Sequence, residues 1–173
     1  MITMAGSVAI ARAIRKEYGI SALIKWPNDI FIGDKKIAGL LLELTAEADT
    51  VHYALLGIGI DANISLTDLS PPLKDILTSL QAEVGHPVDR VALLARVLWE
   101  FELRYQQLEE GEYDSIIREW KSLSLTLDRR VAIKTINKTF VGEAIDIDEH
   151  GALIIRKDNG KVERVIAGDC FQL

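Results

Sequence analysis

The sequence predicts an α+β protein, in which a mixed sheet with packed helices is followed by a small β-barrel. Three observations predict this class. Short apolar runs bounded by Gly, Pro, Asn and Asp fill residues 21–60, as in strands. Apolar residues then recur every three or four positions over residues 70–123, as in helices, and short strands with tight turns return from residue 127. We therefore expect two domains, residues 1–125 and 126–173.

The first domain begins with a predicted helix over residues 4–18. Met4, Val8 and Ile14 lie on one face of this helix, and Gly19 offers a left-handed end. Four strands follow, and the Gly33-Asp34 turn between the second and third predicts a hairpin. Because the strands are short and bounded by turn residues, we expect them to share one sheet. They are residues 21–25, 29–32, 37–44 and 51–60.

Three helices are predicted next, and the chain then ends in strands. Ser70-Pro71-Pro72 starts the first helix, which ends at Gly85. Asp89 caps a long second helix, and Tyr113 begins the third. Four later strands with tight turns favour a small barrel of the SH3-like type. They are residues 130–136, 140–147, 151–156 and 162–166.

Composition excludes several classes of protein. The 173 residues carry 20 basic and 26 acidic side chains, a net charge of −6, which argues against a chain built to coat nucleic acid or an anionic membrane. No run approaches the roughly 18 apolar residues of a spanning helix. One cysteine, Cys170, excludes an intramolecular disulfide. We therefore expect a cytoplasmic protein.

The segment Lys25-Trp26-Pro27-Asn28-Asp29 has the residues best suited to chemistry. It places a cation, an amide and a carboxylate at the start of a strand, across a hairpin from Lys35 and Lys36. A carboxylate near two ammonium groups suits a phosphate and Mg²⁺ site, in which the acid meets the metal and the lysines meet the anion. A plain turn with a solvated lysine is the alternative, because Pro-Asn-Asp is also favourable turn chemistry.

A second segment, Gly57-Ile58-Gly59-Ile60-Asp61, places two glycines inside a predicted strand. It has no third glycine at the dinucleotide-binding spacing and no helix pattern directly after it, so we reject a Rossmann fingerprint. Glycines in a buried strand allow another backbone or a flat ligand to approach closely. Both interpretations remain open at this point.

Together these segments resemble those of the biotin–protein ligase (biotin–[acetyl-CoA carboxylase] ligase) family. The resemblance spans almost the whole chain, and the ordered combination of motifs is highly specific. It implies a class II synthetase-like ligase domain followed by an SH3-like domain. The matching strings are KWPND at 25–29, KKIAGLLLE at 35–43 and GIGI at 57–60, followed by Trp120, Gly142, GAL at 151–153 and Gly168-Asp169.

The resemblance implies a two-step ligation. The carboxylate of biotin attacks the α-phosphate of ATP, which gives biotinyl-5′-AMP and pyrophosphate. A lysine amine of a biotin carboxyl carrier protein, a subunit of acetyl-CoA carboxylase, then takes the biotinyl group. Two anions meet in the first step, so cations and Mg²⁺ are needed to screen their repulsion. No DNA or membrane partner is expected. A homodimer is one of the alternatives, because the family contains both monomers and dimers.

The resemblance also assigns roles to residues. Lys36 matches the catalytic lysine that contacts the biotin carboxylate and the adenylate. Gly39, Gly57 and Gly59 match the backbone wall beside biotin. The residues assigned to ATP are Lys25, Asn28, Asp29 and Asp61, and Asp29 is also assigned to the metal.

Two departures from the family pattern affect the expected activity. Asp61 stands where the family usually has Asn, and an acceptor-only anion near phosphates should weaken ATP binding; Asn63 matches a second asparagine. The family's Gly/Arg-rich string, whose arginines hold the adenylate phosphate, does not occur in this sequence, and neither does a DNA-binding winged helix. We therefore expect weak or absent ligation by the isolated chain, with Met1 either internal to a longer gene or the start of a remnant.

Two other functions remain as alternatives. The first is a non-catalytic carrier-binding or regulatory remnant of such a ligase. The missing Gly/Arg-rich string and Asp61 favour it, whereas the intact Lys25–Asp29 motif and Lys36 oppose it. The second is a lipoate or octanoate transferase of the same catalytic fold, which is not expected to keep KWPND together with this β segment.

Overall fold

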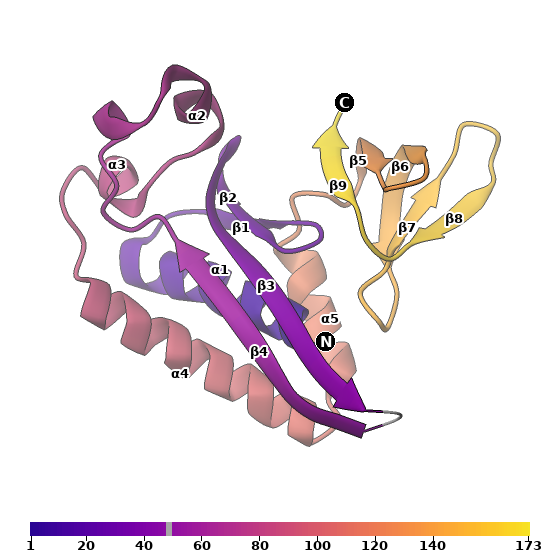
Figure 1. Ribbon diagram of the computed structural model, residues 1–173, viewed down its shortest axis with the longest axis horizontal. Coiled ribbons are helices and arrows are strands. Elements are labelled where there is room, and N and C mark those ends of the chain that lie inside the picture. Colours follow the sequence, from indigo (N-terminus) through magenta and orange to yellow (C-terminus); the bar gives the residue numbers. More distant parts are fainter. Residues whose placement is uncertain (48–49) are drawn as a thin grey trace.

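The computed structural model describes residues 1–47 and 50–173, and it shows two β-sheets with helices packed on the first (Figure 1). The expected α+β class is confirmed. The first sheet has the order β1-β2-β3-β4 and the second the order β8-β7-β6-β5-β9. The helices are α1 (Ile2–Tyr18), η1 (Leu66–Asp68), α2 (Pro71–Ile76), α3 (Leu80–Val84), α4 (Arg90–Glu109) and α5 (Tyr113–Ser122). The strands are β1 (Ala22–Lys25), β2 (Asp29–Ile32), β3 (Lys35–Glu47), β4 (Thr50–Ile60), β5 (Arg129–Lys134), β6 (Thr139–Ile147), β7 (Leu153–Arg156), β8 (Val162–Val165) and β9 (Asp169–Gln172).

Helix α1 lies at the centre of the helical layer, because it packs against the first sheet and against α4 and α5. Six of its ten buried residues are Gly, Ala or Ser, so the backbone approaches the sheet closely. A Cβ at Gly6 would lie 2.7 Å from Leu40 Cδ2 and 3.0 Å from Leu56 Cδ2. The helix ends, as expected, at Gly19, whose φ of 68° favours glycine. Among the described residues, no helix has the length and apolar character needed to cross a membrane.

The strand register divides the first sheet into two different faces. All its named strands pair antiparallel, and parallel contacts are limited to isolated bridges such as Ile24–Ser124. Residues directly opposite each other share a face. Leu40 points toward α1, so Gly39 and its partners Asp29 and Gly59 lie on the face away from the helices.

The second sheet differs from the expected barrel. Strand β9 pairs with β5, and β8 pairs with β7 at the opposite end of the order. Within the described part of the chain these two strands do not pair with each other, so the barrel is not closed. Strand β9 lies beyond the four strands delimited from the sequence, the last of which ends at residue 166.

The predicted helix between Ser70 and Gly85 is interrupted. Leu77 is extended, with φ −118° and ψ 152°, and ends α2. The backbone N–H of Thr78 donates to the carbonyl of Lys36 at 2.9 Å, so this segment is anchored to the start of β3. Ser79 then caps α3 by accepting from the backbone N–H of Ala82. A tertiary hydrogen bond to β3 therefore interrupts the expected helix.

Helix α4 buries only part of the apolar pattern that its sequence carries. Val97 is buried and Phe101 packs against the core, whereas Leu94 and Leu98 are each 57% exposed. The buried positions include Glu100 and Arg104. Leu94 and Leu98 face outward because, in the described parts of the chain, no element covers them.

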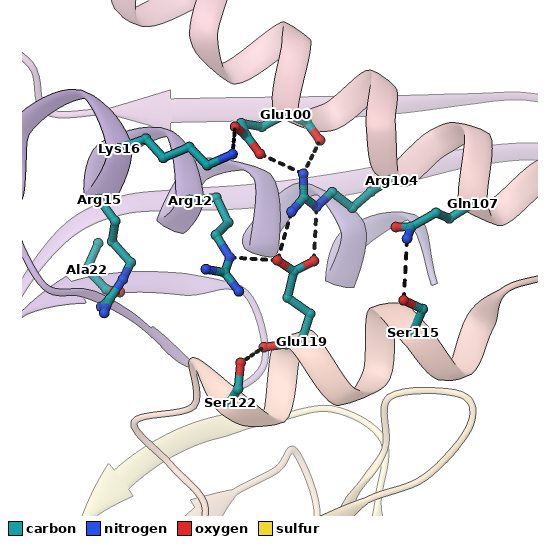
Figure 2. A network of polar contacts seen from close by, with 10 residues as sticks. All are labelled: Arg12, Arg15, Lys16, Ala22, Glu100, Arg104, Gln107, Ser115, Glu119 and Ser122. Carbon is teal, nitrogen blue, oxygen red and sulfur yellow. Dashed lines mark hydrogen bonds and ion pairs between the residues drawn. The ribbon is translucent and has the colours of Figure 1, made fainter.

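A network of charges joins the three long helices (Figure 2). Glu100 of α4 is fully buried; its carboxylate accepts from Lys16 of α1 at 2.8 Å and from Arg104 at 2.6 Å. Arg104 also makes two contacts with Glu119 of α5, at 2.7 and 3.1 Å, and Arg12 of α1 donates to the same carboxylate. Burial alone would raise the pKa of Glu119, but the hydrogen bonds and charges of Arg104 and Arg12 outweigh it and lower this pKa. The network therefore favours the charged carboxylate in the folded protein.

We predict that Arg104→Met reduces the free energy of unfolding by about 3–5 kcal/mol, because it leaves the Glu100 carboxylate buried with one partner fewer. Urea unfolding followed by circular dichroism measures this change. Arg96→Met is the matched control, since the pair of Arg96 and Glu17 is partly exposed and is worth about 0–1 kcal/mol. Equal losses in the two variants would show that the network does not hold the helices together.

Candidate functional site

The central feature of the candidate site is an ion pair between Lys36 of β3 and Asp29 of β2. Lys36 Nζ lies 2.5 Å from Asp29 Oδ1, and both side chains are partly exposed. A β-bulge makes the pair possible. Ala38 pairs with Ile30 on the α1 side, whereas Lys36 pairs with Phe31, so Ile37 is the extra residue. Without this bulge Lys36 would share the face of Ala38, because side chains alternate along a strand.

Glycines leave the backbone bare beside the ion pair. A Cβ at Gly39 would lie 3.1 Å from Lys36 Nζ and 3.2 Å from Asp29 Oδ1. A Cβ at Gly57 would lie 3.6 Å from its nearest neighbour, the carbonyl oxygen of Leu41. A Cβ at Gly59 would lie 4.0 Å from the carbonyl oxygen of Gly39. Gly57 and Gly59 are exposed and Gly39 is half-buried, and we call the surface that these three glycines form the glycine floor. It offers room for a ligand beside Lys36.

Apolar side chains continue the glycine floor along β3 and β4. Leu41, Tyr53 and Leu55 are between 58% and 62% exposed. They lie on the same face as Gly57, because Leu41 is opposite Gly57 and the β4 residues alternate in direction. A bare backbone with a cation at one end and apolar side chains at the other suits a ligand with a carboxylate and an apolar body.

Asn28 fixes the start of β2 against β3. The backbone N–H of Leu40 donates to the carbonyl of Asn28 at 3.0 Å, and the Asn28 side-chain amide donates to the carbonyl of Leu40. Asp29 is the next residue, so this pair of bonds fixes the backbone position from which the Asp29 side chain extends. The Asn28 amide group therefore positions Asp29, in addition to any contact that it makes with a ligand.

Asp61 lies at the end of β4, where burial raises the pKa of its carboxyl group and the nearby charge of Lys36 opposes this rise. Its backbone is held on both sides, because its N–H donates to the Ile37 carbonyl and its carbonyl accepts from Leu80. Asn63 does not lie free beside the site. Its side chain bonds both the N–H and the carbonyl of Val88, at 2.8 and 2.9 Å.

The two adjacent lysines of the hairpin have different surroundings. Lys35 Nζ donates to the carbonyl of Lys74 at 2.8 Å, so Lys35 holds α2 and does not join Lys36 at the ion pair. The expectation that both lysines meet one anion is therefore not met, since consecutive strand residues point in opposite directions. Lys25 lies over the ring of Phe31, with Nζ 4.7 Å from its centroid.

The motif at 25–29 also lines a cavity of about 250 Å³ at the junction with the second sheet. Its opposite wall is formed by residues 168–171, which the sequence did not associate with this motif. Cys170 lies in this wall, where burial raises the pKa of its thiol to about 11. A hollow of about 560 Å³ next to it in the second sheet shares Gly168 and Asp169.

The carboxylates fit Mg²⁺ only together with a nucleotide. Within residues 1–47 and 50–173, no three His, Cys, Asp or Glu side chains are grouped as metal ligands. Mg²⁺ is commonly held by one or two carboxylates together with substrate phosphates and water. Asp29, which already faces the Lys36 ammonium, is the carboxylate that would hold such an ion.

Two family models match the chain. Residues 1–61 match the "Biotin/lipoate A/B protein ligase family" and residues 126–172 match the "Biotin protein ligase C terminal domain". The chain is similar to the bifunctional ligase/repressor BirA of Bacillus subtilis, with 36% identity over 97% of this chain and 51% of that protein. It is also 31% identical to the biotin–[acetyl-CoA-carboxylase] ligase of Paracoccus denitrificans, over 80% of this chain and 58% of that protein.

Solved structures agree in fold. The biotin protein ligase of Aquifex aeolicus in complex with biotin and ATP matches with a TM-score of 0.84 and 23% identity, over 99% of this chain and 70% of that one. The apo form of the same ligase gives a TM-score of 0.87. The chain spans about half the length of the Bacillus relative that it matches. Given the two family models and these relatives, the chain belongs to the biotin protein ligase family.

Proposed function

We propose that this chain carries the biotin-activating centre of a biotin–protein ligase. The observation that supports this most strongly is the Lys36–Asp29 ion pair beside the glycine floor. In the proposal, Lys36 is the catalytic lysine, and Gly39, Gly57 and Gly59 receive biotin. We also propose the domain limits 1–125 and 126–173 and a cytoplasmic location, since the single cysteine forms no disulfide.

In the first proposed step, a biotin carboxylate oxygen attacks the α-phosphorus of ATP and pyrophosphate leaves. The Lys36 ammonium lowers the repulsion between the two anions, and Asp29 holds that ammonium beside the floor. The proposed nucleotide contacts come from Lys25, Asn28, Asp29 and Asp61. When bound, Mg²⁺ would supply further charge neutralisation on the phosphates, held through Asp29.

In the second proposed step, a lysine amine of the carrier protein attacks the acyl carbon of biotinyl-5′-AMP. The new amide bond forms, the acyl–phosphate bond breaks, and AMP leaves with the electron pair. The proposed partner is the biotin carboxyl carrier protein of acetyl-CoA carboxylase. The exposed glycine floor supports this step, because an acyl group lying on it remains open to a second protein.

A non-catalytic, carrier-binding role is the second candidate. It is favoured by the Asp61 carboxylate, which lies near the charge of Lys36. Incubating the chain with biotin, ATP, Mg²⁺ and an apo carrier domain separates the two functions. A ligase centre gives slow, biotin-dependent pyrophosphate release, whereas the second candidate binds the carrier and releases none. Binding of neither biotin nor carrier would contradict both.

We predict that Lys36→Met weakens biotin binding by about 10- to 100-fold, the range expected for one lost charged hydrogen bond. Isothermal titration calorimetry measures this change. Lys35→Met is the matched control, because Lys35 bonds Lys74 of α2 and should change biotin affinity less than twofold. Similar effects of the two substitutions would argue against a special role for Lys36.

We predict that Gly57→Ala weakens biotin binding by about tenfold, because its methyl group would stand on the floor where the ring should lie. The free energy of unfolding should change by less than about 0.5 kcal/mol, since the nearest atom to that methyl group is 3.6 Å away. Unchanged biotin affinity in a normally folded variant would place biotin elsewhere.

We predict that Asp61→Asn strengthens ATP binding at pH 7.5 by about fivefold, because it removes a negative charge near the phosphates. The folded-state pKa of Asp61 is raised, so its carboxylate destabilises the fold at neutral pH and this cost falls as pH falls through that pKa. The variant should therefore lose this part of the pH dependence in urea unfolding between pH 7 and pH 4. Weaker ATP binding in the variant would instead indicate that Asp61 contributes favourably.

A further inference from the structure

Trp26 connects the two sheets of the molecule. It is 2% exposed, and its backbone N–H donates to the Thr126 hydroxyl at 2.9 Å. Its indole Nε1–H donates to the carbonyl of Gly151 at 3.0 Å. Thr126 follows α5, and Gly151 lies in the turn between β6 and β7, so both acceptors belong to the segment from residue 126 onward. Trp26 is therefore bonded to two separate points of this segment, once through its backbone and once through its side chain.

The acceptor turn is itself fixed in position. The N–H of Gly151 donates to the carbonyl of Asp148 at 3.0 Å, and the φ of Gly151 is 82°. A Cβ at Gly151 would lie 3.0 Å from Met4 Sδ of α1, so the turn packs tightly against the first helix. The indole therefore bonds a carbonyl with little freedom to move.

Trp26 stands two residues before Asn28 and three before Asp29. Beyond it, the paired bonds of Asn28 with Leu40 hold the other end of this segment to β3. The junction cavity lies between this segment and residues 168–171, which include most of β9. Strand β9 belongs to the same sheet as β6 and β7, so the position of the Gly151 turn and the opposite wall of the cavity are linked.

We propose that Trp26 is a positioning residue, whose indole hydrogen bond to Gly151 sets the separation between the 25–29 segment and the wall formed by residues 168–171. This inference deepens the proposed function and rests on it. The cavity lies at the nucleotide end of the proposed site, whereas the glycine floor lies on β3 and β4. Trp26 should therefore affect ATP binding and leave biotin binding nearly unchanged.

The test uses the full chain and three variants. Trp26→Phe keeps an aromatic ring and removes the N–H donor, and Thr126→Val removes the second junction bond with little change of shape. Trp99→Phe is the matched control, because Trp99 is 60% exposed on α4. Calorimetry gives the affinities for MgATP and for biotin. Amide hydrogen exchange gives the stability of the junction at Leu125, whose N–H bonds Ile24, and at Leu40.

We expect Trp26→Phe to weaken MgATP binding by about tenfold, the effect of one buried hydrogen bond, while biotin affinity stays within about twofold. Exchange should accelerate at Leu125 and Leu40 relative to the amides of α4. Thr126→Val should act in the same direction, and Trp99→Phe should match the wild type. The proposal would be overturned if Trp26→Phe weakened the binding of MgATP and of biotin equally, or if exchange accelerated uniformly along the chain. It would also be overturned if neither the affinities nor the exchange rates changed.

The two proposals fail in distinguishable ways. If the wild-type chain binds neither MgATP nor biotin, the proposed function fails, and hydrogen exchange alone decides the positioning role. Faster exchange confined to the junction then supports Trp26 as the connection between the sheets. If the wild type binds both ligands and Trp26→Phe binds them equally well, the proposed function stands and the positioning role is wrong.

Discussion

The candidate site depends on one ion pair, between Lys36 and Asp29, formed on the sheet face opposite the helices. This pair exists because a single extra residue, Ile37, reverses the direction of the side chain before it. An ammonium group on the α1 side would be buried among apolar residues at a large desolvation cost. On the other face it lies at the edge of bare backbone, partly solvated, and can exchange a carboxylate of the protein for one of a ligand.

The helices make this division of faces possible. Helix α1 takes up one side of the sheet, and the charges that join α1, α4 and α5 keep the three helices together without using the other side. The opposite face is then free to carry bare glycines and apolar residues that remain exposed. The helices and the proposed binding surface thus lie on different sides of the same four strands, so substitutions can address each side separately.

Much of this arrangement could be predicted from the sequence. The parts that could not be predicted have one physical cause in common. Strands, helices and the motif at 25–29 follow from periodicity and local composition, which depend on neighbouring residues. The bulge at Ile37, the break at Leu77 and strand β9 depend on hydrogen bonds to distant segments, and no local pattern records those. Lys35 and Lys36 cannot be told apart in the sequence. Because side chains alternate along a strand, Lys35 bonds α2 and Lys36 pairs with Asp29. Trp26 was identified within the motif, but its partners Thr126 and Gly151 lie 100 and 125 residues away along the chain.

A crystal structure of the chain grown with saturating biotin would show whether Lys36 and the glycine floor bind this ligand. We expect the biotin carboxylate to lie within hydrogen-bonding distance of Lys36 Nζ, with the ring system on the backbone of Gly39, Gly57 and Gly59. Biotin bound at another surface, or a Lys36 that remains on Asp29 while the glycine floor stays bare, would contradict this expectation.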